Sequence, residues 1–197
     1  MSFVTFAGGN ADKATAYLVR WAGPVLESED PYPNKGGSPR NLSPVRHVQK
    51  VLWLPYRENA LDNATIKYAV REYGAVFATY HHQGEGTSGG VNPYKDSPYW
   101  KADEAAYYMG SYQQANHAVC IVGWDDNYPK EIFNQHVMND GAFICQNSWG
   151  TYFGDDGIFY VSYEDGVLGT CNEVYTRIED TDNYDNIYQY NLRTHIC

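Results

Sequence analysis

The sequence predicts an α+β fold in which helical segments come before a group of antiparallel strands. Apolar residues recur at helical spacing in two segments between residues 10 and 74. From residue 117 onward, short apolar runs alternate with turn residues, as is typical of strands. Helices and strands that occupy separate parts of a chain indicate the α+β class. A chain of 197 residues, 43% of them hydrophobic, is long enough to bury one core or two small ones.

The first predicted helix covers residues 10–21. Asn10 is its cap, because the side chain can accept a hydrogen bond from the first turn, and Gly23 with Pro24 ends it. The residues expected on its apolar face are Ala14, Tyr17, Leu18 and Trp21. A turn-rich loop follows, and residues 47–56 then have the composition of a strand.

The second predicted helix covers residues 61–74 and leads directly into a buried strand at residues 75–80. Asp62 or Asn63 is expected to cap this helix, and Gly74 is expected to end it. Its apolar stripe consists of Ile66, Ala69, Val70 and Tyr73.

The β part of the chain begins after a glycine-rich loop at residues 81–100. Its three predicted strands lie within residues 117–125, 141–149 and 157–165. The last segment, residues 181–197, is first acidic and polar and then irregular, so it is expected to form a tail.

Charge and composition argue against several classes of function. The formal net charge is −10 and the 14 basic residues are scattered, which is unlike a nucleic-acid-binding surface. No apolar run approaches the ~18 residues that a membrane-spanning helix needs. The N-terminal residues also lack the basic, apolar and cleavage regions of a signal peptide.

Neither a metal site nor a cofactor is expected. The four cysteines are widely spaced, without a CxxC pair, at positions 120, 145, 171 and 197. Each is interpreted as a structural residue, since a free cysteine is usually a small buried hydrophobe. His81 and His82 are two adjacent potential metal ligands, but no third ligand follows at a suitable spacing.

His117 and Asn147 are the residues that carry a chemical hypothesis. A lone histidine at the start of a strand is usually structural, but Asn147 ends the next apolar run, so neighbouring strands can bring the two side chains together. An asparagine oxygen accepts an imidazole N–H and thereby sets the tautomer and the orientation of the ring. Trp149 can shield this hydrogen bond from water. The three residues therefore match the orienting half of a nucleophile–His–Asn site.

Four motifs together resemble the papain-like cysteine peptidases, in particular bacterial secreted or surface-attached members. They are "AGGNADKATAYLVRWAGPVLESEDPYP", "IKYAVREYGAVFATY", "NHAVCIVGWDD" and "CQNSWGTYFGDDGIFYVSY", and they cover most of residues 6–180 in the family's order. The resemblance implies a papain-like fold, cofactor-free hydrolysis of peptide bonds in peptide or protein substrates, and an extracellular or cell-surface location. It also implies a partial peptidase domain over residues 1–180, with about residues 1–60 as a remnant of the helical lobe and about residues 61–180 as the β-rich lobe.

The resemblance implies a role for each residue that matches a family motif. His117 matches the catalytic base, Asn147 the residue that orients it, and Trp149 the tryptophan that shields the pair. Two residues, Gly8 and Gly9, match the glycine pair whose backbone binds an extended peptide substrate.

Two more positions match the neighbourhood of the family's site. Ala118 matches a wall of the pocket for the second substrate side chain before the cut. Phe153 stands where the family usually has a second tryptophan, and it is expected on the rim of the same cleft.

The chain departs from the family in one major respect. In the family, a nucleophilic cysteine at the start of a long helix and a glutamine that binds the oxyanion come before the glycine pair. No segment like "QGxxGxCWAF" occurs in these 197 residues. The chain is therefore expected to be inactive alone unless another segment completes the site.

Two interpretations follow from this departure. In the first, the chain is the C-terminal portion of a cysteine endopeptidase, and an upstream segment or a second chain supplies the nucleophile. In the second, it is a non-catalytic relative that binds peptides or proteins, or a truncated product. Because loss of the helix exposes apolar surface, an upstream segment, a partner or a second copy is expected to cover the gap.

Overall fold

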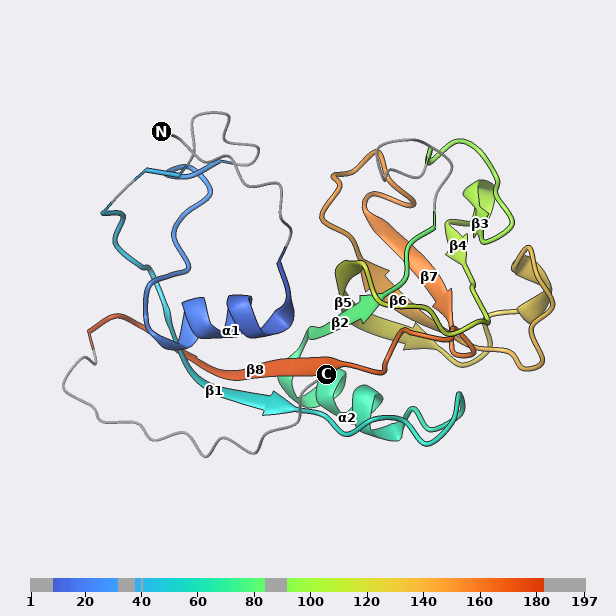
Figure 1. The fold of residues 1–197 in the computed structure, drawn as a ribbon, viewed down its shortest axis with the longest axis horizontal. Coiled ribbons are helices and arrows are strands. Elements are labelled where there is room, and N and C mark those ends of the chain that lie inside the picture. The colour runs from blue at the N-terminus through green and yellow to red at the C-terminus, as the bar shows by residue number, and fades with distance from the viewer. Residues whose placement is uncertain (1–8, 32–37, 40, 84–91, 183–197) are drawn as a thin grey trace. The chain divides into compact units, whose positions relative to one another are not determined.

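The computed structural model describes residues 9–31, 38–39, 41–83 and 92–182. The chain divides into two compact units. The first comprises Met1–Leu52 and Tyr175–Ile196, and the second comprises Trp53–Val174. Strands β1 (His47–Trp53) and β8 (Asn172–Glu179) each continue from one unit into the other (Figure 1).

The helix of the first unit, α1 (Ala11–Val19), is confirmed, but its predicted apolar face is wrong. Asn10 caps it as expected and accepts a hydrogen bond from the backbone of Lys13 over 3.0 Å. The buried residues of the helix are Ala11 and Thr15, whereas Ala14 and Tyr17 are exposed. The prediction fails because the helix ends before Trp21, which has a φ of +62° and stacks its ring on His47 at 4.2 Å. Trp21 therefore does not continue the helical period.

The predicted strand at residues 47–56 is confirmed as β1, whereas the sequence does not predict β8. Residues 172–179 read "NEVYTRIE" and mix charged with apolar side chains, and only the first three are buried. A short strand that is buried at one end and exposed at the other shows no clean alternation. Its pairing with other strands therefore becomes visible only in the fold.

The second helix, α2 (Ala64–Tyr73), agrees closely with the prediction. It ends at Gly74, whose φ of +92° is a conformation that favours glycine. Ile66 and Ala69 are buried in the core, but Tyr73 is exposed and does not belong to the apolar stripe. Asn63 occupies the cap position without capping the helix, because its side-chain oxygen accepts a hydrogen bond from Arg57 at 2.9 Å.

The strands form a sheet with the order β1-β8-β2-β5-β6-β7-β4-β3. The remaining bounds are β2 (Val76–Tyr80), β3 (Trp100–Lys101), β4 (Ala106–Tyr107), β5 (His117–Asp125), β6 (Ala142–Gln146) and β7 (Ile158–Ser162). Short 3-10 helices lie at Ala102–Glu104 and Lys130–Ile132. The four strands predicted in this part of the chain are confirmed as β2, β5, β6 and β7. The sequence does not predict β3 and β4, because two residues are too few to show an alternating pattern.

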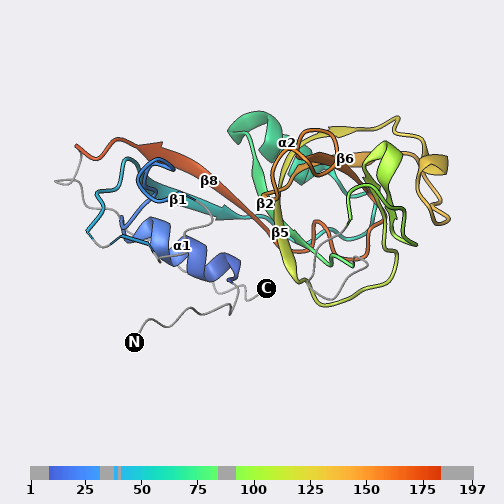
Figure 2. The ribbon, with the colours of Figure 1, turned by 90° about the horizontal axis from the view of Figure 1, so that it is seen from above.

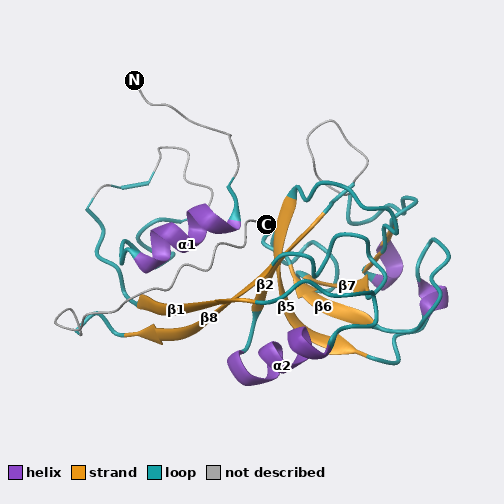
Figure 3. Ribbon diagram, turned by 60° about the horizontal axis from the view of Figure 1, so that its bottom comes forward, coloured by secondary structure: helices purple, strands orange, loops and turns teal. Residues whose placement is uncertain are grey.

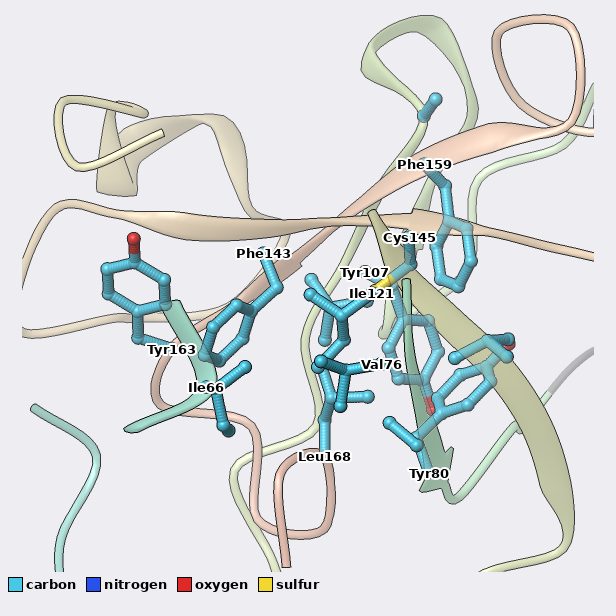
Figure 4. Packing of buried hydrophobic residues seen from close by; sticks show 14 of the residues in the cluster. Ile66, Val76, Tyr80, Tyr107, Ile121, Phe143, Cys145, Phe159, Tyr163 and Leu168 are labelled. Atoms are coloured by element: carbon cyan, nitrogen blue, oxygen red, sulfur yellow. The ribbon is translucent and has the colours of Figure 1, made fainter. Parts of the chain in front are cut away.

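The main core lies along the centre of this sheet, where α2 packs against β2 and β5 (Figures 2 and 3). Figure 4 shows Val76, Ile121 and Cys145 in the middle of the core, with Phe143 and Tyr163 toward one end and Tyr80 toward the other. Helices with a largely antiparallel sheet confirm the predicted α+β class. No helix in the described residues is long and apolar enough to cross a membrane.

Strand register brings three strand ends to one edge of the sheet. In the antiparallel pair β2–β5, Tyr80 at the end of β2 lies opposite His117 at the start of β5. In the antiparallel pair β5–β6, Cys120 lies opposite Gln146 at the end of β6. The residues that follow β2 and β6 therefore meet the first residues of β5.

Candidate functional site

A hydrogen bond between His117 and Asn147 forms the centre of the candidate site. His117 Nε2 lies 2.9 Å from Asn147 Oδ1. The backbone N–H of Ser148 donates to the same Oδ1 over 2.8 Å, and the backbone N–H of Asn147 donates to Gly157 over 2.9 Å. These bonds hold the Asn147 side chain in place, and only 8% of the residue is exposed.

The bond from Ser148 determines which nitrogen of His117 carries the proton. The Asn147 side-chain atom that accepts the Ser148 N–H must be the amide oxygen, since the amide nitrogen cannot accept. An oxygen without a proton can only accept, so His117 Nε2 carries the proton and donates to it. In the neutral ring, Nδ1 then keeps its lone pair. Nδ1 makes no hydrogen bond with the described residues, so it is free to act as a base.

The protonation of His117 is governed by two opposing effects. Burial of the half-buried ring lowers its pKa below the ordinary value, and the hydrogen bond to Asn147 acts in the opposite direction. Burial is the larger effect, so the free site favours the neutral imidazole at neutral pH.

Trp149 packs against the ring of His117. Its ring lies 4.5 Å from the His117 ring, centroid to centroid, with 31° between the planes. Phe153 supports Trp149 in an edge-to-face contact at 5.0 Å. The expectation that Phe153 lies on a cleft rim is wrong, because it is 1% exposed and stacks on Trp100 at 4.9 Å inside the core.

The other matched residues are placed as follows. Ala118 is exposed on β5 and lies opposite Thr79 in the sheet. Gly9 is exposed and belongs to the first unit, whereas Gly8 lies outside the described residues. The roles that the resemblance assigns to these positions remain predictions.

Neither Cys120 nor Cys145 is placed to serve His117 as a nucleophile. Cys145 is fully buried and lies opposite Ile121, about 13 Å along β5 from His117 at the usual rise per residue. Cys120 alternates to the other face of β5. Burial raises the pKa of both thiols, which makes them poor nucleophiles.

The remaining cysteines and the potential metal ligands form no metal cluster within the described part of the chain. Cys171 directly precedes β8, and Cys197 lies outside the described residues, as does most of the predicted tail at 181–197. Across the described ranges, no three histidine, cysteine or acidic residues come close enough to hold a metal ion.

Sequence reasoning missed two residues beside the pair. His82 is treated there only as a potential metal ligand, yet it is 7% exposed and lies 4.8 Å from the Trp149 ring. Asn116 binds the backbone of His82 through both side-chain atoms. The available signal in the sequence is that Asn116 directly precedes His117. Because His117 pairs with Tyr80, Asn116 lies next to the residues that follow Tyr80, which are His81 and His82.

Solved structures with a similar fold include two of one clostridial protein. One is the cysteine protease Cwp84, in a cysteine-to-alanine form after propeptide cleavage. It is 33% identical with a TM-score of 0.72, and the match covers 89% of this chain and 42% of that one. The other contains the cysteine protease and lectin-like domains of Cwp84, a surface-layer-associated protein of Clostridium difficile. Its identity, TM-score and coverage of this chain are the same, and the match covers 38% of that chain.

A more distant structure agrees on the fold alone. A structure from work on the mite allergens Blo t 1 and Der p 1 is 22% identical with a TM-score of 0.52, and the match covers 86% of this chain and 48% of that one. The present chain thus spans less than half of each of these solved chains. No curated protein sequence matches it.

The family profile described as "Papain family cysteine protease" matches residues 5–178, which include the whole candidate site. The motifs, the His117–Asn147 geometry, the fold and this match agree with one another. The chain belongs to the papain family of cysteine proteases.

Proposed function

We propose that this chain supplies the proton-transfer half of a cysteine-type peptidase. His117 acts as general base and then general acid, Asn147 orients its ring, and Trp149 keeps water from the bond between them. The observation that carries the proposal is the bond from His117 Nε2 to Asn147 Oδ1, which leaves Nδ1 with a free lone pair.

The proposed reaction proceeds through a thioester. A cysteine thiol passes its proton to His117 Nδ1, and the thiolate attacks the scissile carbonyl. As the C–N bond breaks, the imidazolium gives its proton to the leaving amine and an acyl-enzyme forms. Water then attacks the thioester while His117 takes its proton, and the acid product leaves as that proton returns to the thiolate.

In the proposed reaction, the nucleophile is not one of these 197 residues. It comes from another segment of the same polypeptide or from a second chain. The burial of Cys145 and the direction of Cys120 support this assignment. The first two solved relatives support it as well, because each is much longer than the part that this chain matches.

The proposed substrate is an extended peptide or an unfolded segment of a protein. The proposed location is the cell surface. The support for this location is the description of the 33% identical protein Cwp84 as a surface-layer-associated protein.

Labelling and hydrolysis assays test the proposal. The 197-residue chain and a longer polypeptide carrying the family's glutamine and cysteine helix are treated with an epoxysuccinyl peptide and a fluorogenic peptide. We expect hydrolysis and a single thiol adduct only in the longer polypeptide. His117→Ala should lower kcat/KM by about 10³-fold, the usual contribution of general base catalysis, whereas the exposed-site control His136→Ala should not.

Absence of thiol-dependent hydrolysis in the longer polypeptide would overturn the proposal. Saturable binding of the peptide without hydrolysis would instead support a non-catalytic, peptide-binding relative. The raised thiol pKa values of Cys120 and Cys145 favour that second function for the 197-residue chain by itself.

A further inference from the structure

A second histidine, His82, is buried directly beside the His117–Asn147 pair. Its ring meets the Trp149 ring edge to face, with centroids 4.8 Å apart and 86° between the planes. It also lies 6.2 Å from the His117 ring. On its other side, it stacks on the Tyr107 ring at 6.0 Å. His82 therefore fills the space between the core and the tryptophan that covers the site.

The backbone around His82 is held from two directions. Asn116 Oδ1 accepts the His82 N–H at 2.7 Å, and Asn116 Nδ2 donates to the His82 carbonyl at 2.9 Å. The Tyr107 hydroxyl donates to the His81 carbonyl at 2.6 Å and accepts the Gln83 N–H at 3.2 Å. These four bonds extend the order of the sheet beyond the last residue of β2.

The ring itself has one polar contact and one free nitrogen. Nδ1 lies 3.0 Å from the Tyr80 hydroxyl, whereas Nε2 is buried without a hydrogen-bond partner in the described part of the chain. A buried, unpaired nitrogen is unfavourable, and a phenylalanine would fill the same space without it. Packing alone therefore does not account for a histidine at this position.

The surroundings of His82 keep it uncharged. Burial lowers its pKa to about 4, with smaller contributions from the neighbouring histidines His117 and His81. The hydroxyl groups that face it, on Tyr80 and Tyr107, have raised pKa values because they are buried, and they stay neutral as well. No charge therefore lies beneath Trp149 when His117 takes up a proton.

We propose that His82 is a positioning residue, a neutral imidazole that holds Trp149 over the His117–Asn147 hydrogen bond. This inference rests on the proposed function, since it assigns a task within that site. While His82 is neutral, its packing keeps Trp149 in place and does not oppose the charge on His117. When acid protonates His82, a buried positive charge appears 6.2 Å from the His117 ring and beside the Trp149 ring. Repulsion between the two histidines and the cost of burying this charge then disturb the packing that holds Trp149.

Spectroscopy on the 197-residue chain tests this inference without any nucleophile. The tryptophans are labelled with 5-fluorotryptophan, and the fluorine resonance of Trp149 is assigned with Trp149→Phe. This resonance and the ring protons of His117 are followed by NMR between pH 3.5 and 8.5. The proteins compared are the wild type, His82→Phe, His82→Ala and the exposed-site control His136→Ala.

The wild type and His136→Ala should show a shift of the Trp149 resonance with a midpoint near pH 4, and His82→Phe should not. His82→Ala should raise the pKa of His117, because water then reaches a ring whose pKa is lowered mainly by burial. A change of about threefold or more in its acid dissociation constant is expected. If acid unfolds the wild type first, the onset of unfolding should move to lower pH in His82→Phe.

A Trp149 transition that persists in His82→Phe, or an unchanged onset of unfolding, would overturn the inference even if His82→Ala failed to fold. So would a folded His82→Ala that matches His136→Ala in both resonances. These readouts do not depend on hydrolysis. Loss of the proposed function would show as an inactive longer polypeptide with the NMR results intact, whereas failure of this inference would leave an active one.

Discussion

The two ends of the core in the second unit differ in how completely their buried polar groups are hydrogen-bonded. Close to Tyr163, which Figure 4 shows toward one end of the core, Arg57 and Asp165 each make several hydrogen bonds. Asp165 is 4% exposed, and its carboxylate accepts three backbone N–H bonds, from Met109, Val167 and Leu168. Arg57 adds bonds to the carbonyls of Tyr163 and Leu168.

At the Tyr80 end, polar atoms of the site are buried and unpaired. His82 Nε2 and Asn147 Nδ2 have no partner among the described residues. Native proteins seldom leave such atoms unpaired, because each costs about 1–3 kcal/mol. The comparison indicates that the hydrogen bonds of Asp165 stabilise the fold. The unpaired atoms around His117 lower its stability, and they belong to side chains that lie where the proposed chemistry needs them.

The largest expected effect comes from breaking the bonded end. Asp165→Ala leaves three buried backbone N–H groups without acceptors, so we expect the free energy of unfolding to fall by about 3 kcal/mol or more. Urea unfolding followed by circular dichroism measures this change. The matched control is Asp103→Ala, an exposed position, which should change stability by less than about 0.5 kcal/mol. Equal effects of the two substitutions would contradict the comparison.

The next effect is a loss of stability in acid that originates at the His117 end. The folded-state pKa of His82, about 4, lies below its ordinary value of 6.5, so the unfolded chain binds more protons between these values. The contribution of His82 is therefore complete above pH 6.5 and is lost as the pH falls toward 4. It amounts to about 3 kcal/mol, and the lowered pKa of His117 acts in the same direction.

Urea midpoints at pH 7, 5.5 and 4.5 measure this dependence. His82→Phe should have a flatter profile than the wild type, because the substituted ring cannot take up a proton. Parallel profiles for the two proteins would show that the acid sensitivity arises elsewhere.

The smallest expected effect on stability comes from Asn147→Ala. We expect a loss of about 1–2 kcal/mol, since the His117 N–H and the Ser148 N–H lose one shared acceptor. The same change should lower the pKa of His117 further, because the hydrogen bond that raises it is removed. An NMR titration of His117 measures the direction, with the exposed residue Asn127→Ala as control. A rise in the pKa of His117 would show that water has entered the site and outweighs the lost bond.

The sequence is most informative where side chains repeat with a clear period. Helix α2 and the strands β2, β5, β6 and β7 are predicted closely because each has such a pattern and a turn residue at its end. Two-residue strands such as β3 have no period to detect. The face of α1 is predicted wrongly because Trp21 leaves the helix and stacks on His47, a partner distant in the sequence.

Part of the candidate site can also be predicted from the sequence, and part of it only from the tertiary structure. By itself, the sequence determines that His117 and Asn147 can meet, because each lies at the end of a strand and adjacent antiparallel strands place such ends side by side. The tertiary structure alone decides that His82 is buried under Trp149 and that Phe153 lies in the core. Burial depends on which distant segments pack over a side chain, and that packing sets the solvation and pKa of the buried group.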